Sequence, residues 1–270
     1  MIAQLTPFES AEAAFSDTIF NGVRLSTRST PAQYAARGGD WCETFVLSDD
    51  IVALSIGDVC GHGAEAFPAM TAIRRAVREA AFRGLDPART LATANRFVCD
   101  LDPDLHATAF FAWLDTHRGV VTFANSGHPP PLLVAPSGSR FLTYAVADLP
   151  LGIESVLAPE LRVASMPGGS LLVLYTDGVA EHERRPLRGE AQLRAAADLA
   201  YKYSVSQVAS AIEALMFLTP ANRDDASILT AWMPRQTGRI HADRTSWYRD
   251  FHARRDLSIA AAAAHRPAAL

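Results

Sequence analysis

The hydrophobic and polar positions of the chain predict strands and helices that occur in pairs. Continuous apolar runs of strand length cover Ile51–Gly57, Ser170–Thr176 and Ala226–Trp232. Two more runs, Ala107–Leu114 and Val120–Asn125, flank a short polar turn and predict a hairpin. Apolar residues at helical spacing predict four helices, over residues 64–83, 86–101, 187–201 and 206–218.

Local signals support the ends of the first two helices. Gly84 ends the first, and Asp86 followed by Pro87 gives the second a cap and a proline at its first position. Before residue 31 the weaker pattern predicts one helix around Ala11–Phe20 and then a strand. Because strands pair with strands and helices with helices, the order favours an α+β domain with antiparallel sheet over an alternating parallel one.

The pattern divides the chain into a domain over residues 1–235, with its core at about 35–233, and a different C-terminal segment. Residues 236–270 contain six Arg and three Asp, a net charge of +3. Because the whole chain has a net charge of −4, residues 1–235 carry −7. The segment ends in an alanine-rich stretch, and Trp247 and Phe251 have the spacing of a short amphipathic helix. We expect either a frayed tail or a docking or self-regulating segment for an acidic surface.

The composition excludes several classes of protein. With 49% apolar and 20% charged residues, the chain has the material of a soluble globular protein with a sizeable core. A net charge of −4 argues against broad nucleic-acid binding. We find neither a signal peptide nor the roughly 20 apolar residues that a membrane helix needs. Cys42, Cys60 and Cys99 have no CxxC spacing and indicate free thiols in a reducing cytoplasm.

Four short segments place an aspartate at the end of a strand. They are GGDWCE with Asp40, GDVCGHG with Asp58, YTDGVAE with Asp177, and NRDDAS with Asp224 and Asp225. A lone Asp-Gly is usually a turn, but four such segments can converge on one rim of a sheet. Because clustered carboxylates repel one another and are hard oxygen ligands, they favour Mg²⁺ or Mn²⁺. Two such ions about 3.5–4 Å apart share a bridging water that suits attack on a phosphate ester.

At these residues the sequence resembles the PPM (type-2C) family of metal-dependent serine/threonine protein phosphatases, and more narrowly its bacterial SpoIIE/RsbU-like branch. The resemblance covers about residues 20–233. It rests on five segments in family order: Gly38–Asp40, Gly57–Gly63, Asn125–Pro131, Thr176–Gly178 and Asp224–Asp225. It implies an αββα sandwich of two antiparallel sheets flanked by helices. It also implies hydrolysis of phosphoserine or phosphothreonine by a metal-activated water, without a phospho-enzyme intermediate.

The resemblance also implies the metal ligands. The carboxylates of Asp40 and Asp58 and the backbone carbonyl of Val59 would bind two ions, Mn²⁺ or Mg²⁺, and Asp40 and Asp58 would act in catalysis through the metal-activated water. Asp177 and Asp224 would complete the set. Asp225 would cap or support the loop behind its neighbour.

Three further residues lie near these segments. Glu43 and His62 each have a functional and a structural interpretation, and His128 has a structural one. Glu43 stands where the family often has aspartate, and it either supports the metals, or a third metal, or is structural. His62 lies four residues after Asp58, at a different offset from the histidine of type-2C relatives. It is either a general acid or part of the turn into the next helix, whose N-terminal amides favour an anion. His128, before three prolines, is expected to be structural.

Two functions follow from these residues. The first is a cytoplasmic phosphoprotein phosphatase, and family substrates in this branch are commonly phosphorylated anti-sigma-factor antagonists of the STAS type. The alternative is a non-catalytic relative that binds a phosphoprotein or scaffolds a partner, although all four core aspartates are present. A diguanylate cyclase and a P-loop enzyme lack support in the motifs. Because only about 30 residues precede the motif-bearing core, regulation is expected from a partner, a homodimer or the tail.

Overall fold

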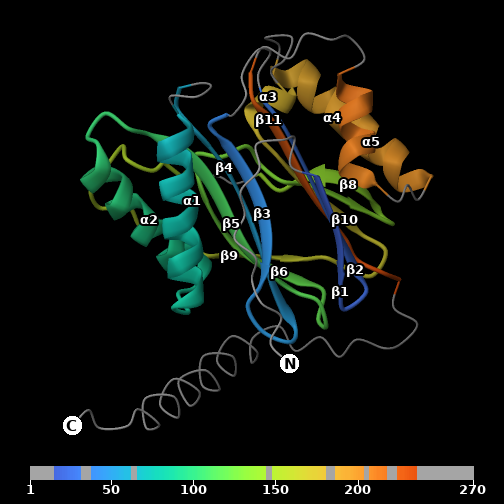
Figure 1. Ribbon diagram of the computed structural model, residues 1–270. Helices are drawn as coiled ribbons and strands as arrows, with labels where there is room; N and C mark the ends of the chain where they lie inside the picture. The colour runs from blue at the N-terminus through green and yellow to red at the C-terminus, as the bar shows by residue number, and fades with distance from the viewer. Residues whose placement is uncertain are drawn as a thin grey trace, which may run out of the picture. The chain divides into compact units, whose positions relative to one another are not determined.

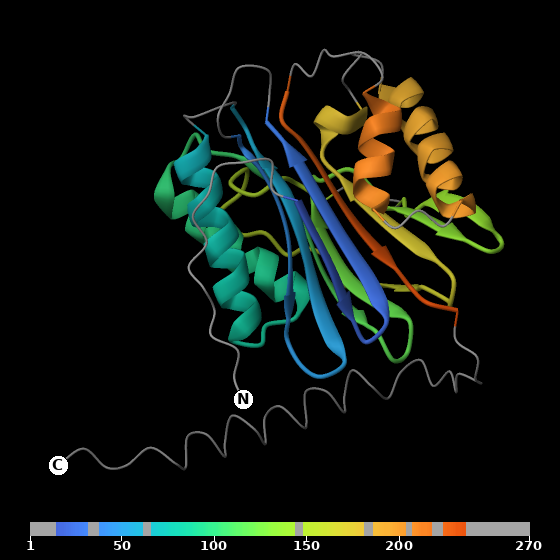
Figure 2. The same cartoon turned by 45° about the vertical axis from the view of Figure 1, so that its right-hand side comes forward.

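The computed structural model describes seven stretches of the chain, all within one compact unit that ends at Gln236. They are residues 15–31, 38–61, 66–143, 148–180, 186–203, 207–217 and 224–235. Two antiparallel sheets lie between helices on both outer sides (Figures 1 and 2). This arrangement confirms the predicted α+β αββα sandwich. The segment 236–270 lies outside the described residues, so its role stays a prediction.

One sheet has six strands in the order β1-β2-β11-β10-β7-β8, with neighbours antiparallel. Its strands are β1 (Phe15–Phe20), β2 (Val23–Thr30), β7 (Leu132–Ala135), β8 (Gly138–Phe141), β10 (Leu171–Tyr175) and β11 (Ala226–Trp232). The helix predicted around Ala11–Phe20 was wrong from residue 15 onward, because those residues pair with β2 as an edge strand. Residues 11–14 lie outside the described part.

The other sheet has five strands in the order β3-β4-β5-β6-β9. Its strands are β3 (Asp40–Val46), β4 (Ile51–Val59), β5 (Ala107–Asp115), β6 (Val120–Ser126) and β9 (Arg162–Ser165). The predicted hairpin is confirmed, since β5 and β6 pair in antiparallel register. The edge strands β3 and β9 were not predicted.

Helices cover the outer face of each sheet (Figure 1). They are α1 (Phe67–Phe82), α2 (Pro87–Leu101), α3 (Asp177–Ala180), α4 (Pro186–Lys202) and α5 (Val208–Met216). The first two pack on the five-stranded sheet, and α4 and α5 pack on the six-stranded one. The predicted cap of α2 is confirmed, because the Asp86 carboxylate accepts the N–H of Arg89 at 2.9 Å. None of the helices in the described ranges has the length and apolarity to cross a membrane.

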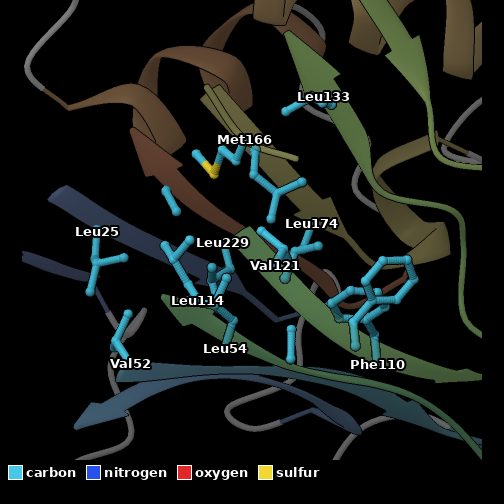
Figure 3. Close-up of a cluster of buried hydrophobic side chains, with 14 of the residues drawn as sticks. Leu25, Val52, Leu54, Phe110, Leu114, Val121, Leu133, Met166, Leu174 and Leu229 are labelled. Atoms are coloured by element: carbon cyan, nitrogen blue, oxygen red, sulfur yellow. The ribbon is translucent and has the colours of Figure 1, made fainter. Parts of the chain in front are cut away.

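The central strands of the six-stranded sheet are buried on both faces, and alternate residues of β10 show how. Leu172 and Leu174 join the core between the two sheets, where Figure 3 labels Leu174, whereas Leu171 and Val173 join the core beneath α4 and α5. Burial on two faces explains why the strands of the sandwich have continuous apolar runs rather than alternating ones. The sandwich thereby holds the strand ends that carry the acidic segments in fixed register.

Candidate metal centre

Asp40 and Asp58 stand directly opposite each other at one end of the pair β3 and β4. Asp40 is buried, and its Oδ2 accepts the Thr176 hydroxyl at 2.7 Å, so it faces the end of β10 in the other sheet. Burial, and next the charge of Asp58, raise the pKa of Asp40 well above its ordinary value. Burial and the nearby charge of Asp177 raise the pKa of Asp58 to about 7.

Asp177 and Asp224 come to the same rim from the six-stranded sheet. Asp177 is the first residue of α3, which lies at the upper end of the strands in Figure 1, and Asp224 precedes β11. The Thr176 hydroxyl accepts the Ser227 N–H at 2.8 Å and so fixes the two strand ends together. Partial burial, and next the charge of Asp224, raise the pKa of Asp177. The four predicted aspartates therefore converge, and each sheet supplies two of them.

The predicted position of the aspartates needs one correction. Asp58 and Asp177 come at or after the ends of strands, but Asp40 begins β3 and Asp224 comes before β11. The rim is shared because the sheets are antiparallel, so the start of one strand lies beside the end of its neighbour.

Asp225 is buried and links the two sheets behind this rim. Its Oδ2 accepts the Gly39 N–H at 2.7 Å, while its own N–H donates to Oδ1 of Asp224 at 2.9 Å. A side chain at Gly38 would place its Cβ 2.3 Å from the Asp225 carboxyl group. The neighbouring carboxylates thus differ in their surroundings, since Asp224 is exposed at the rim and Asp225 accepts a backbone N–H group.

The carbonyl of Val59 lies beside the Asp58 carboxylate. A Cβ built on Gly39 would be 2.9 Å from the Val59 carbonyl oxygen and 3.4 Å from Oδ1 of Asp58. A side chain at position 39 would therefore crowd both oxygens, and glycine avoids this. This arrangement fits the predicted backbone ligand.

Glu43 is the one predicted site residue among the described ones that the structure places elsewhere. It is three positions after Asp40 on β3, so the alternation of the strand directs it to the opposite face of the sheet. There its Oε2 accepts a hydrogen bond from Arg78 of α1 at 3.2 Å. The prediction that Glu43 supports the metals is corrected, and the structural alternative holds.

The two predicted histidines have different outcomes. His62 lies outside the described residues, so its role as a general acid stays a prediction. His128 closes a turn, because its backbone N–H and C=O both bond the Asn125 side chain at 2.8 Å. Its Nδ1 lies 3.0 Å from the hydroxyl of Thr108, the residue opposite Asp58, and burial lowers its pKa to about 3. The expected structural role of His128 is confirmed.

The donor set of the rim fits a divalent cation. No Arg, Lys or His side chain in the described ranges forms an ion pair with Asp40, Asp58, Asp177 or Asp224. In the same ranges, no three acidic, His or Cys side chains are already arranged to hold a metal ion together. Asp177 and Asp224 are exposed, so their side chains are able to turn toward an ion. The rim therefore offers hard oxygen ligands, and rotation of the Asp177 and Asp224 side chains toward a cation would complete its coordination.

Comparison with known proteins assigns the chain to a family. The family model described as Stage II sporulation protein E (SpoIIE) matches residues 48–233. The chain belongs to the SpoIIE family. Phosphoserine phosphatase RsbU of Bacillus subtilis is 28% identical over 154 residues, which cover 57% of this chain and 45% of RsbU. The SpoIIE-family chain thus spans less than half the length of that relative.

Solved structures of similar proteins have the same sandwich. The RsbU and RsbW domains of Rv1364c from Mycobacterium tuberculosis match with a TM-score of 0.68 and 28% identity, over 79% of this chain and 61% of that one. RsbX in complex with magnesium matches with a TM-score of 0.64 and 16% identity, over 82% and 100% of the two chains. The second likeness shows the fold alone.

Two residues of this SpoIIE-family site were missed from the sequence. Thr176 binds both Asp40 and the backbone of Ser227, and its place directly before Asp177 was the available signal. Gly178 packs against another acidic segment, because a Cβ at this position would lie 2.0 Å from the Asp225 carbonyl oxygen. No sequence pattern indicates such a close approach between distant segments.

Proposed function

We propose that this SpoIIE-family chain is a metal-dependent phosphoprotein phosphatase, a hydrolase of phosphoserine and phosphothreonine monoesters. One observation carries the proposal: carboxylates from both sheets meet at one rim, raise one another's pKa values, and have no ion-pair partner among the described residues. Such a cluster is costly at neutral pH unless cations neutralise it. The name of the relative RsbU, a phosphoserine phosphatase, supports the reaction.

Each ligand in the proposal has a place at the rim. The carboxylates of Asp40, Asp58, Asp177 and Asp224 and the carbonyl of Val59 would hold Mn²⁺ or Mg²⁺, with two ions expected. When bound, the ions would activate water and neutralise the charge of the phosphoryl group. The magnesium in the RsbX structure supports a divalent cation.

The chain's own residues would keep these ligands in position. Thr176 donates to Oδ2 of Asp40, whose carboxyl group also interacts with that of Asp58. The buried turn at His128 contacts Thr108, directly beside Asp58 in the sheet. Asp58 lies on β4, and Asp177 begins α3 two residues after β10 ends, so ordered elements rather than long loops hold both.

We further propose a phosphoprotein as the substrate, for example a phosphorylated STAS-type antagonist of an anti-sigma factor, in bacterial signalling in the cytoplasm. The exposed position of Asp177 and Asp224 suits a phosphorylated residue presented on a protein surface. A homodimer or a partner would supply regulation. A regulatory partner would be identified by the change in turnover that it causes when it is added at physiological concentration.

Phosphate release tests the proposed function. The full chain with Mn²⁺ is expected to hydrolyse a phosphoserine protein and p-nitrophenyl phosphate, and excess EDTA is expected to abolish both activities. Activity that survives in EDTA would contradict a metal mechanism. Tight binding of the phosphoprotein without any turnover in Mn²⁺ would favour the non-catalytic scaffold.

A further inference from the structure

The pairing of β3 and β4 contains an interruption next to Val59. The register that places Asp40 opposite Asp58 places Gly39 opposite Val59. The Val59 N–H donates to the Gly39 carbonyl at 3.2 Å. In an antiparallel ladder, a pair that makes one of these bonds ordinarily makes both, so the Gly39 N–H would donate to the Val59 carbonyl.

The second bond of this pair is replaced by a bond to the other sheet. The Gly39 N–H donates instead to Oδ2 of Asp225 at 2.7 Å. The strand on the other side does not compensate, because Ala107, opposite Val59 on β5, donates its N–H to the Leu151 carbonyl at 3.1 Å. The Val59 carbonyl thus loses the donor that the sheet would have supplied.

We infer that Asp225 is a positioning residue that keeps the Val59 carbonyl available as a metal ligand by taking the Gly39 N–H from it. The inference rests on the proposed function. A buried carbonyl that has lost its hydrogen-bond donor destabilises the fold. Such a carbonyl is therefore expected where another group, here a metal ion, can take the place of the donor. A side chain at Gly39 would place its Cβ 2.9 Å from this carbonyl oxygen and 3.4 Å from Oδ1 of Asp58, so glycine keeps both oxygens uncrowded on this side.

A competing explanation is that Asp225 acts by its charge. That charge is among the causes that raise the pKa values of Asp40 and Asp58, so its loss would also change cation binding. Asparagine separates the two explanations, because its amide oxygen accepts the Gly39 N–H but carries no charge. Alanine removes both the acceptor and the charge. The difference between Asp225→Asn and Asp225→Ala therefore reports on the side-chain acceptor at a constant charge.

The test uses the full chain and two measurements. The first is the Mn²⁺ dissociation constant by titration calorimetry. Asp225→Ala is expected to bind Mn²⁺ at least about tenfold more weakly than Asp225→Asn, since loss of a group that orients a ligand typically costs 10–100-fold in affinity. The second is the amide proton resonance of Gly39 in metal-free protein. It is expected to stay downfield in Asp225→Asn and to move upfield in Asp225→Ala.

Asp115→Ala is the matched control, because it removes a buried carboxylate that also accepts backbone N–H groups, at the far end of β5. It is expected to leave Mn²⁺ affinity unchanged. If Asp225→Ala does not fold, Asp225→Leu fills a similar volume without an acceptor.

Equal Mn²⁺ affinities for the asparagine and alanine variants would overturn the inference and assign the effect to charge. Wild-type protein that binds Mn²⁺ and releases phosphate would still support the proposed function in that case. Failure of the wild-type protein to bind Mn²⁺ would overturn both.

Discussion

The strand pair β4 and β5 carries an aspartate at each of its two ends, Asp115 buried and Asp58 half-buried, and their surroundings differ. At one end Asp115, opposite Ile51, accepts the backbone N–H groups of His117 at 3.0 Å and Arg118 at 2.7 Å. The Arg118 guanidinium adds a third bond at 3.0 Å. At the other end Asp58 faces Asp40 across the sheet, and burial and neighbouring carboxylates raise the pKa values of both.

The difference shows that a buried carboxylate does not by itself indicate a site. The chain supplies donors and a positive charge to Asp115, so that carboxylate stabilises a turn. The rim carboxylates have like-charged neighbours instead, and a cation from outside the chain would neutralise them. The partners of a carboxylate, rather than its burial, therefore separate a structural aspartate from a candidate ligand.

The largest expected effect comes from changing the rim. Asp58→Asn or Asp177→Asn is expected to lower phosphate release by about 10³-fold or more, because stabilisation of transition-state charge by a metal is worth several kcal/mol. The unfolding midpoint in EDTA is expected to stay the same or rise, since one repulsive charge is removed. Phosphate release and thermal unfolding check the two parts. Near-wild-type turnover in both variants would contradict the claim that the rim end of β4 and β5, unlike the Asp115 end, is a metal centre.

The second effect comes from the other end of the same strands. Asp115→Ala is expected to lower the free energy of unfolding by about 2 kcal/mol, because two backbone N–H groups lose an acceptor. The ion pair adds little, since the Arg118 side chain is 42% exposed. Urea unfolding measures this loss. The turnover of the folded protein should equal that of wild type, and a large fall in turnover would contradict the comparison.

A smaller effect is expected from pH in metal-free protein. The folded-state pKa of Asp58, about 7, lies above the ordinary value of 3.8, so the folded state binds the proton more tightly than the unfolded state. Stability is therefore reduced most above pH 7 and recovers as the pH falls toward 4. Unfolding in EDTA should show about 1 kcal/mol more stability at pH 6 than at pH 8. Asp58→Asn should flatten this trend, and an unchanged trend in that variant would assign it to other groups.

Much of the fold was predictable because its central strands have long apolar runs. The strands β4, β5, β6, β10 and β11 and the helices α1, α2, α4 and α5 were predicted close to their observed limits. Four of the strands that escaped prediction, β1, β3, β8 and β9, are the edge strands of the two sheets. Edge strands have fewer neighbours to pack against, so their apolar pattern is weaker.

The missed strand β3 also explains the error at the site. Without β3, Glu43 could be assigned beside Asp40 from its position in the motif. With it, a spacing of three residues in a strand puts the two side chains on opposite faces. The bond from Gly39 to Asp225 could not be predicted, because it joins residues 186 positions apart and one partner is a backbone group.

Mn²⁺ binding to the full chain at pH 7.5 tests the central claim most directly. Titration calorimetry is predicted to show about two ions bound to wild-type protein, affinity at least about 100-fold weaker in Asp58→Asn, and wild-type affinity in Asp115→Ala. Wild-type protein that binds no Mn²⁺ at millimolar concentration, or that binds it equally well after Asp58→Asn, would contradict the claim that this rim is a metal centre.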